Sequence, residues 1–209
     1  HSYSSAASDV YKRQINLLAV IVAVPVIGMT IIAPALTIIK NDLNISFENT
    51  QLILTLYFTF LAFGQILSGP FSDKYGRKPI LLLGASIYSI SAFFASLSSN
   101  IEILLILRCF QGFGAAACLS VGRTILSDCY EIKEAAKEMS KMTAIMAVIP
   151  ISCFIFGGFL AEFLGWRTNL LALGLISLIL IIAMSFLLNE TLIKKAKSTS
   201  FKNMFMVYR

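Results

Sequence analysis

The chain of 209 residues is 57% hydrophobic and only 13% charged, with a formal net charge of +6 and a mean hydropathy of +0.82. Soluble domains are roughly one-quarter charged, because polar groups have to cover their surface. The composition therefore excludes a soluble enzyme, a disordered tail and a disulfide-stapled secreted domain. It predicts a helical membrane protein with several spans.

The first residues of the chain read differently from the rest. The sequence does not begin with Met, and hydrophobic residues start abruptly at Ile15. The segment from Ser4 to Gln14 resembles the translation of a transposase-type sequencing adaptor. We therefore expect residues 1–14 to be a non-native tail, leave them out of the fold prediction and treat the chain as a fragment. A genuine polar tail is the alternative.

Six apolar stretches are long enough to cross a hydrocarbon core about 30 Å thick, which takes about 20 residues. They cover residues 15–39, 50–69, 79–97, 103–125, 139–163 and 168–188. The stretches lack the period-two alternation of membrane strands. The expected fold is all-α, with a six-helix transmembrane bundle over residues 15–190. A cytoplasmic linker is expected to start over residues 191–209.

Lysine and arginine are concentrated in every second connection, and this asymmetry predicts the orientation of the spans. The even-numbered connections and the segment after the sixth span contain Lys74, Arg77, Lys78, Lys133, Lys137, Lys141, Lys194, Lys195, Lys197, Lys202 and Arg209. The opposite side contains only Lys40 and Arg167. Both ends of the chain are therefore expected in the cytoplasm. The net charge of +6 follows from this asymmetry and does not indicate nucleic-acid binding.

No catalytic or metal-binding pattern is recognisable in the sequence. The four cysteines have no CxxC or Cys/His spacing, and His1 is the only histidine. There is no nucleophile–base pair and no phosphate-binding loop. We therefore expect a protein that is not an enzyme and that has no cofactor and no metal site.

Two connections share a spacing that indicates an internal repeat. In each, a glycine (Gly69 or Gly158) is followed four residues later by a carboxylate, then by a second glycine and a cation. The two segments fall on opposite sides of the membrane, each after the second helix of a three-helix unit. An inverted-topology duplication leaves this pattern, so we expect two inverted three-helix repeats.

The segment GPFSDKYGRKP, residues 69–79, connects the second and third spans. Gly69 permits a close helix approach, Asp73 can pair at a helix end, and Gly76 permits a tight reversal. Arg77 and Lys78 hold the loop inside. The segment resembles the loop signature between helices two and three of the major facilitator superfamily, which implies a conformational switch loop. A plain cytoplasmic turn is the alternative.

Arg108 lies within the fourth span, where insertion scales put the cost of a charge at about 2.5–3.5 kcal/mol. Such a charge normally faces a cavity or a partner, and snorkelling to the outer interface is the alternative. Three partners are open to it: backbone carbonyls with Gln111, a carboxylate of the missing half, or the substrate. Gly112 and Gly114 form a small-residue face for close helix packing. The segment resembles the fourth-helix motif of the same superfamily, whose arginine is implicated in proton coupling.

The fifth span contains Pro150, followed by Gly157 and Gly158. It resembles the fifth-helix motif of drug antiporters, which implies a kinked and closely packed helix. Cys153 and Phe154 stand where that motif has a further Gly-Pro or Ala-Pro. The expected hinge is therefore only half present.

Further segments resemble bicyclomycin-resistance-type drug efflux transporters, namely residues 29–36, 121–130, 165–167 and 190–192. The resemblance covers residues 29–192 and implies the N-terminal six-helix half of a twelve-helix transporter. In the first span, Thr30 stands in place of the usual Asp. We assign Thr30 and Pro34 to a substrate or proton pathway together with Arg108 and Gln111. Pro25, Gly28 and Pro34 are expected to interrupt the first helix, as in a segment that lines a cavity.

In this fold the substrate cavity lies between two halves that rock about it. The resemblance implies a proton-coupled antiporter for drugs or other small molecules in a bacterial inner membrane. Its partners would be lipid, a small-molecule substrate, protons and the missing C-terminal half. A metabolite importer or facilitator is the runner-up, for an anion in view of Arg108, and a non-transporting remnant is the third reading. No carboxylate lies deep in a span, so a proton carrier is expected from the missing half unless a carboxylate near a span end reaches the cavity. Those carboxylates are Asp73, Glu102, Asp128 and Glu162.

Overall fold

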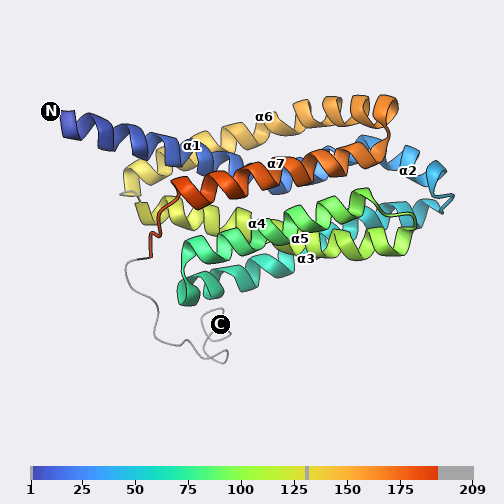
Figure 1. The fold of residues 1–209 in the computed structure, drawn as a ribbon, viewed down its shortest axis with the longest axis horizontal. Helices are drawn as coiled ribbons and strands as arrows, with labels where there is room; N and C mark the ends of the chain where they lie inside the picture. Colours follow the sequence, from blue (N-terminus) through green and yellow to red (C-terminus); the bar gives the residue numbers. More distant parts are fainter. Residues whose placement is uncertain (1, 130–131, 193–209) are drawn as a thin grey trace.

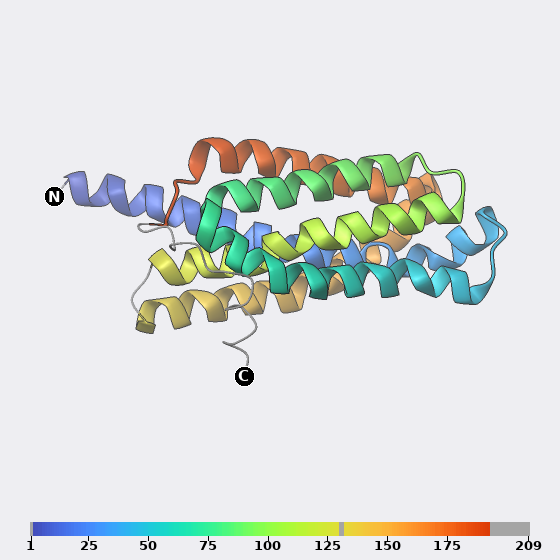
Figure 2. The same cartoon turned by 90° about the horizontal axis from the view of Figure 1, so that it is seen from below.

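A computed structural model describes residues 2–129 and 132–192, with side chains over 16–129 and 133–192. The elements are α1 (Ser2–Thr30), the 3-10 turn η1 (Ala33–Ala35), α2 (Leu36–Asp42), α3 (Phe47–Tyr75), α4 (Arg77–Ser96), α5 (Ile101–Cys129), α6 (Ile132–Leu164) and α7 (Trp166–Leu187). They form an elongated bundle in which the start of α1 and the end of α7 lie at the same end (Figures 1 and 2). The expected linker from residue 193 onward lies outside the described residues.

The described residues contain six helical stretches long and apolar enough to cross a membrane, which confirms the six predicted spans. Most helices run past the predicted limits, and α3 and α5 have 29 residues each. A helix satisfies its own backbone hydrogen bonds, so its polar ends can continue beyond the apolar stretch. At the other end of the chain, α1 already begins at Ser2, within the segment that resembles an adaptor.

The first span is broken at one place rather than at the three expected ones. α1 ends at Thr30 and the chain continues through η1 into α2. Pro34 lies in η1, and its missing N–H and its ring are incompatible with a continuous α-helix. Pro25, in contrast, lies inside α1 without ending it. Its carbonyl accepts a hydrogen bond of 2.9 Å from the Tyr57 hydroxyl of α3.

Two single-residue turns show the inverted repeat in the backbone. Gly76 alone separates α3 from α4, and Gly165 alone separates α6 from α7. Their φ angles are 112° and 87°, each with a ψ of 152°, a conformation that residues with a Cβ rarely adopt. The two turns lie at opposite ends of the bundle (Figure 1). The same turn thus follows the second helix of each unit, which confirms the two inverted three-helix repeats.

Each three-helix unit also supplies an acid to an arginine of the other unit. Arg77, at the start of α4, pairs with Asp128 near the end of α5, with 3.0 Å between Nε and Oδ2. Arg167, in the first turn of α7, pairs with Asp42 at the end of α2, with 2.7 Å between Nη1 and Oδ2. In both pairs the third helix of one unit meets the first span of the other. The two units are therefore joined in the same way at both ends of the bundle.

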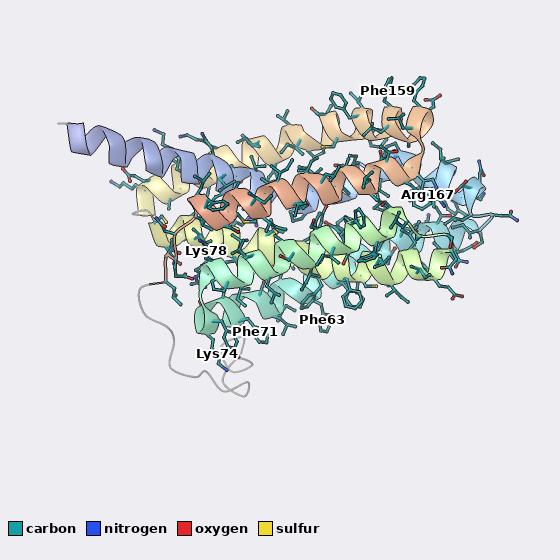
Figure 3. The ribbon with its side chains drawn as sticks, in the orientation of Figure 1. Phe63, Phe71, Lys74, Lys78, Phe159 and Arg167 are labelled. Carbon is teal, nitrogen blue, oxygen red and sulfur yellow. The ribbon has the colours of Figure 1, made fainter. Side chains whose placement is uncertain are left out.

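The spans differ strongly in how much of their surface the bundle covers. Of the most apolar window of each span, 61% is buried in the first span but only 22% in α3 and 11% in α6. Phe63 and Phe71 on α3 and Phe159 on α6 point away from the bundle (Figure 3). Lys74 and Lys78 lie at one end and Arg167 at the other (Figure 3). The exposed apolar surface is therefore a band between two charged ends, as contact with lipid would require.

Candidate functional site

Arg108 of α5 lies inside the bundle with no exposed surface. Its guanidinium donates to Gln111 Oε1, to the Ile53 carbonyl of α3 and to the Gly28 carbonyl of α1, the last two at 3.3 Å. The guanidinium carbon also lies 4.2 Å from the centre of the Tyr57 ring, a cation–π contact. The carbonyls with Gln111, one of the three expected sets of partners, are contacted here, and the side chain does not snorkel.

Two further polar side chains lie in the same region, Tyr88 of α4 and Gln111, and both are fully buried. No described carboxylate pairs with Arg108, so the cluster holds an uncompensated positive charge. A buried cation without a carboxylate is costly inside an apolar span, so we treat this cluster as a functional candidate.

The other two residues assigned to the pathway, Thr30 and Pro34, lie apart from this cluster. The Thr30 hydroxyl donates to the Val26 carbonyl of its own helix at 2.8 Å. A Cβ built on Gly158 would lie 3.5 Å from Pro34, so Pro34 packs beside α6. The structure therefore brings Arg108 and Gln111 together and does not bring Thr30 and Pro34 to them.

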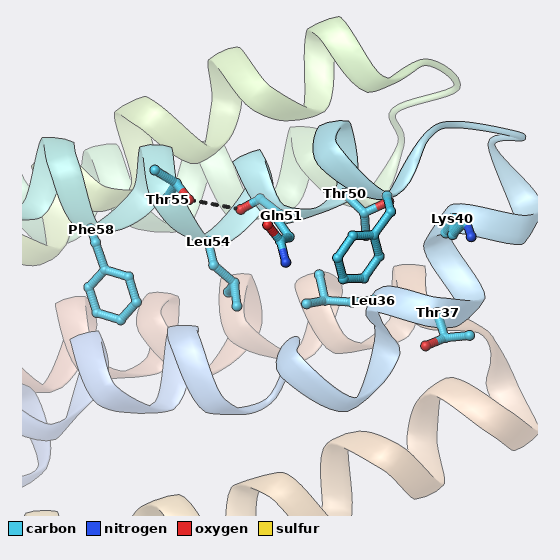
Figure 4. A pocket seen from close by; sticks show the side chains of 9 residues that line it. Leu36, Thr37, Lys40, Thr50, Gln51, Leu54, Thr55 and Phe58 are labelled. Carbon is cyan, nitrogen blue, oxygen red and sulfur yellow. Dashed lines mark hydrogen bonds between the residues drawn. The ribbon is translucent and has the colours of Figure 1, made fainter.

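A cavity of about 420 Å³ lies between α2, the last part of the first span, and the beginning of α3 (Figure 4). Its apolar lining comes from Leu36, Phe47, Leu54 and Phe58, and its polar lining from Thr37, Lys40, Thr50, Gln51 and Thr55. The Thr50 and Thr55 hydroxyls are bonded to carbonyls of their own chain segment. Lys40 is the charged residue of this lining. The cavity suits an amphipathic molecule, and none of the four predicted pathway residues lines it.

The loop between α3 and α4 is organised around Arg77, which is largely buried. Arg77 pairs with Asp73 of the preceding turn and with Asp128, and it donates to the Ser72 hydroxyl at 2.7 Å. Asp73, which was expected to pair at a helix end, pairs with Arg77. A Cβ on Gly69 would meet no heavy atom within 4 Å, so the described residues make no close helix approach there. No other described helix approaches that side of α3 closely.

Glu190, which follows α7, joins this loop from a distant part of the chain. Its carboxylate accepts hydrogen bonds from the backbone N–H groups of Arg77 at 2.9 Å and Lys78 at 3.2 Å. These groups form the start of α4, where a negative charge is favourable. The Lys78 ammonium donates to the Ser185 carbonyl of α7. The sequence marked Glu190 only through the resemblance of residues 190–192, and the spacing did not predict this contact.

Glycines allow the backbones of neighbouring spans to approach closely at three places. A Cβ on Gly112 would lie 2.2 Å from the Tyr57 carbonyl of α3, and one on Gly114 would lie 2.5 Å from the Gly84 carbonyl of α4. On α6, a Cβ on Gly157 would lie 2.3 Å from the Ile31 carbonyl. Pro150 lies inside α6, which continues through it as one helix. The close contacts therefore lie at these glycines rather than at the proline.

Replacement of Asp73 by Asn in the full-length protein is expected to impair transport while leaving membrane insertion intact. The change removes one carboxylate from Arg77 but leaves Asp128, so the fold is retained and only the loop is loosened. Initial transport rates, normalised to the protein in the membrane, measure the effect. Glu138→Gln, which removes an ion pair with Lys141 in α6, is the matched control. Unchanged rates in the Asp73 variant would mean that the loop only sets the membrane orientation and has no role in transport.

The chain is similar to known membrane transporters. A sequence profile described as "Major Facilitator Superfamily" matches residues 18–204. A "Bicyclomycin resistance protein homolog" of Haemophilus influenzae is 30% identical over 83% of this chain and 44% of that protein. A "Chloramphenicol resistance protein" of Pseudomonas aeruginosa is 33% identical over 83% of this chain and 40% of that protein. "Multidrug resistance protein D" of Escherichia coli is 29% identical over 75% and 40%, respectively.

A solved structure of a bacterial homolog of the human lysosomal transporter Spinster, inward-facing and unoccupied, has the same fold. Its TM-score is 0.76 at 20% identity, over 91% of this chain and 45% of that one. The chain thus spans less than half the length of the curated relatives it matches.

Proposed function

The chain belongs to the major facilitator superfamily, and on this premise we propose that it forms the N-terminal half of a transporter that exports small amphipathic molecules. The observation that carries the proposal is the similarity to the bicyclomycin, chloramphenicol and multidrug resistance proteins. The cavity beside α3, with its mixed apolar and polar lining, supports a cargo of this kind.

Alternating access is the proposed mechanism, with this six-helix unit rocking against a second one. The largely uncovered faces of α3 and α6 support it, because they offer apolar surface to a second half. Rigid-body motion requires each half to hold its own shape. The reciprocal ion pairs Arg77–Asp128 and Arg167–Asp42 join the two repeats within this half and so support a rigid unit.

Proton coupling is part of the proposal, and its carrier would come from the second half. The described carboxylates lie near helix ends and none lies beside Arg108. The buried charge of Arg108 would then respond to protonation of a carboxylate across the cavity. We assign Arg108 and Gln111 of this half to the pathway. Thr30 and Pro34, at the break of the first span, belong to the same assignment.

The proposed location is the inner membrane of a bacterium, with both ends of the chain in the cytoplasm. The bacterial relatives support the location. The orientation is supported by the positive-inside rule, since Lys74 and Lys78 lie at the end opposite to Arg167 (Figure 3). Lipid, a small-molecule cargo and the C-terminal half complete the proposed partners.

Import or facilitated diffusion of a metabolite is the second candidate function. Thr30 in place of the Asp usual in drug exporters favours it, as do Cys153 and Phe154 in the fifth span. Arg108, a buried cation without a described carboxylate, favours an anionic metabolite.

Export is tested with the full-length protein in a bacterium that lacks its own drug pumps. Cells that produce the protein are expected to accumulate less chloramphenicol than control cells, and a protonophore should abolish the difference, because the export draws on the proton gradient. Equal accumulation with the protein present in the membrane would contradict export of this drug. Export that persists with the protonophore would contradict proton coupling, and faster uptake of organic anions would favour the second candidate.

A further inference from the structure

At the break in the first span, one backbone carbonyl lacks its helical hydrogen bond and instead accepts one from a side chain that is distant in the sequence. At the break, the Ala35 N–H donates to the Ile32 carbonyl, so the Ile31 carbonyl has no backbone donor. The amide nitrogen of Asn169, in the first turn of α7, donates to the Ile31 carbonyl at 2.9 Å. The same nitrogen donates to the Gly157 carbonyl of α6 at 3.0 Å. Asn169 is fully buried, so this contact lies inside the protein.

The same turn of α7 also holds the far end of α2. The Trp166 indole N–H donates to the Asp42 carboxylate at 3.0 Å, and Arg167 pairs with the same oxygen at 2.7 Å. Arg167 also donates to the Ser98 carbonyl after α4 at 3.2 Å. The first turn of α7 therefore binds the last part of the first span at both of its ends, at Ile31 and at Asp42. We call Trp166, Arg167 and Asn169 the α7 bracket.

Apart from the bracket, α2 is held mainly by Ile39, which is fully buried in the apolar core. α1 packs against α5, α6 and α7, whereas α2 has its main contacts with α3 and with the η1 turn next to it. Gly157 lets α6 come so close that a Cβ would lie 2.3 Å from the Ile31 carbonyl. The backbone is thus packed by three helices up to the break and mainly by α3 beyond it. Thr37 and Lys40 on α2 line the cavity, so a turn of α2 would change the cavity wall.

We propose that the break at residues 31–35 is a hinge of the transport cycle and that Asn169 is the residue that positions it. Asn169 ties the freed Ile31 carbonyl to α6 and α7, so it limits how far α2 turns about the break and keeps Thr37 and Lys40 in the cavity wall. This role rests on the proposed transport function, but the placement of α2 does not, so the two are tested separately.

The test uses the full-length protein with its cysteines replaced and one cysteine introduced at Thr37 on α2 or at Thr55 on the opposite wall. Asn169→Leu, close to Asn in size but without the amide, is combined with each. Labelling by a membrane-impermeant maleimide is expected to be about threefold or more faster at position 37, because the population of displaced α2 rises, and unchanged at position 55. The control, Ser177→Ala, removes a buried hydroxyl that bonds only within α7 and should alter neither rate.

Transport supplies the second readout. Asn169→Leu is expected to lower the maximal rate about tenfold or more, since small displacements at a hinge strongly affect turnover. If Asn169→Leu fails to reach the membrane, Asp42→Asn, which weakens the other end of the bracket, should increase labelling at position 37 in the same way. Unchanged labelling at position 37 in these variants, or an equal increase at 37 and 55, would overturn the proposal. A parent protein that transports nothing would instead count against the proposed function, and the labelling would still decide the role of Asn169.

Discussion

Transport by the full-length protein is expected to fall about a hundredfold or more when Arg108 is replaced by Ala, because the buried charge that links three spans disappears. Without the guanidinium, the Gly28 carbonyl and Gln111 Oε1 lose their donor. Each buried polar group left without a partner costs about 1–3 kcal/mol. The Tyr57 ring also loses its cation.

Arg108→Lys is expected to retain a fraction of the activity. An ammonium keeps the charge, but it cannot reproduce the planar fork that reaches Ile53, Gly28 and Gln111 together. Initial rates over a range of external pH, normalised to membrane-inserted protein, measure both variants. Arg123→Ala is the matched control on α5, since Arg123 is exposed and contacts only the Met146 sulfur among its described hydrogen-bond partners. Parental transport by Arg108→Ala at every pH would remove this residue from the pathway.

Replacement of Gly112 by Ala is expected to lower the free energy of unfolding by about 1–3 kcal/mol or more, because the new methyl group overpacks a backbone contact. Its Cβ would lie 2.2 Å from the Tyr57 carbonyl and 3.2 Å from the Leu61 nitrogen. A carbonyl in the middle of α3 cannot move aside as a flexible side chain can. α3 and α5 would have to separate, and the contacts of Arg108 with α3 would lengthen.

Gly69→Ala is the matched control for this prediction. Gly69 is also a helical glycine, but its Cβ would enter open space, so the substitution should be neutral or stabilise the helix by up to about 1 kcal/mol. Thermal unfolding in detergent, followed by helical circular dichroism, compares the two variants with the parent. Equal stability of the two variants would mean that the α3–α5 contact is looser than the structure has it.

The spans and the repeat could be predicted because both depend on short patterns of neighbouring residues. Apolar stretches of sufficient length mark the spans, and the glycine-to-carboxylate spacing marks turns that need a left-handed glycine at Gly76 and Gly165. The contact of Arg108 with Gln111 was also within reach, since residues three apart share a helix face. The expectation of three interruptions in the first span was wrong, because Pro25 is accommodated inside α1.

The long-range contacts of the candidate site could not be predicted in the same way. The rotation of each helix about its axis decides that Tyr57 reaches the Pro25 carbonyl and that Asn169 reaches Ile31, and no local pattern encodes that rotation. The sequence did contain one sign of the role of Asn169, because a carboxamide within an apolar span needs hydrogen-bond partners there. Glu190 lies beyond the last span, and its contact with the start of α4 depends on the path of the chain after α7.

The exchange of acids between the two repeats has a consequence for biosynthesis. During synthesis Arg77 is made before two of its partners, since Asp128 follows it by 51 residues and Glu190 by 113. Until then Asp73 is the one described acid of the nascent chain that pairs with this largely buried arginine. Asp42 likewise waits for Arg167, which is made 125 residues later. A nascent chain of three helices thus lacks the partners of several of its ion pairs. We therefore expect insertion factors or membrane proteases to bind this intermediate, and the six helices to become stable only together.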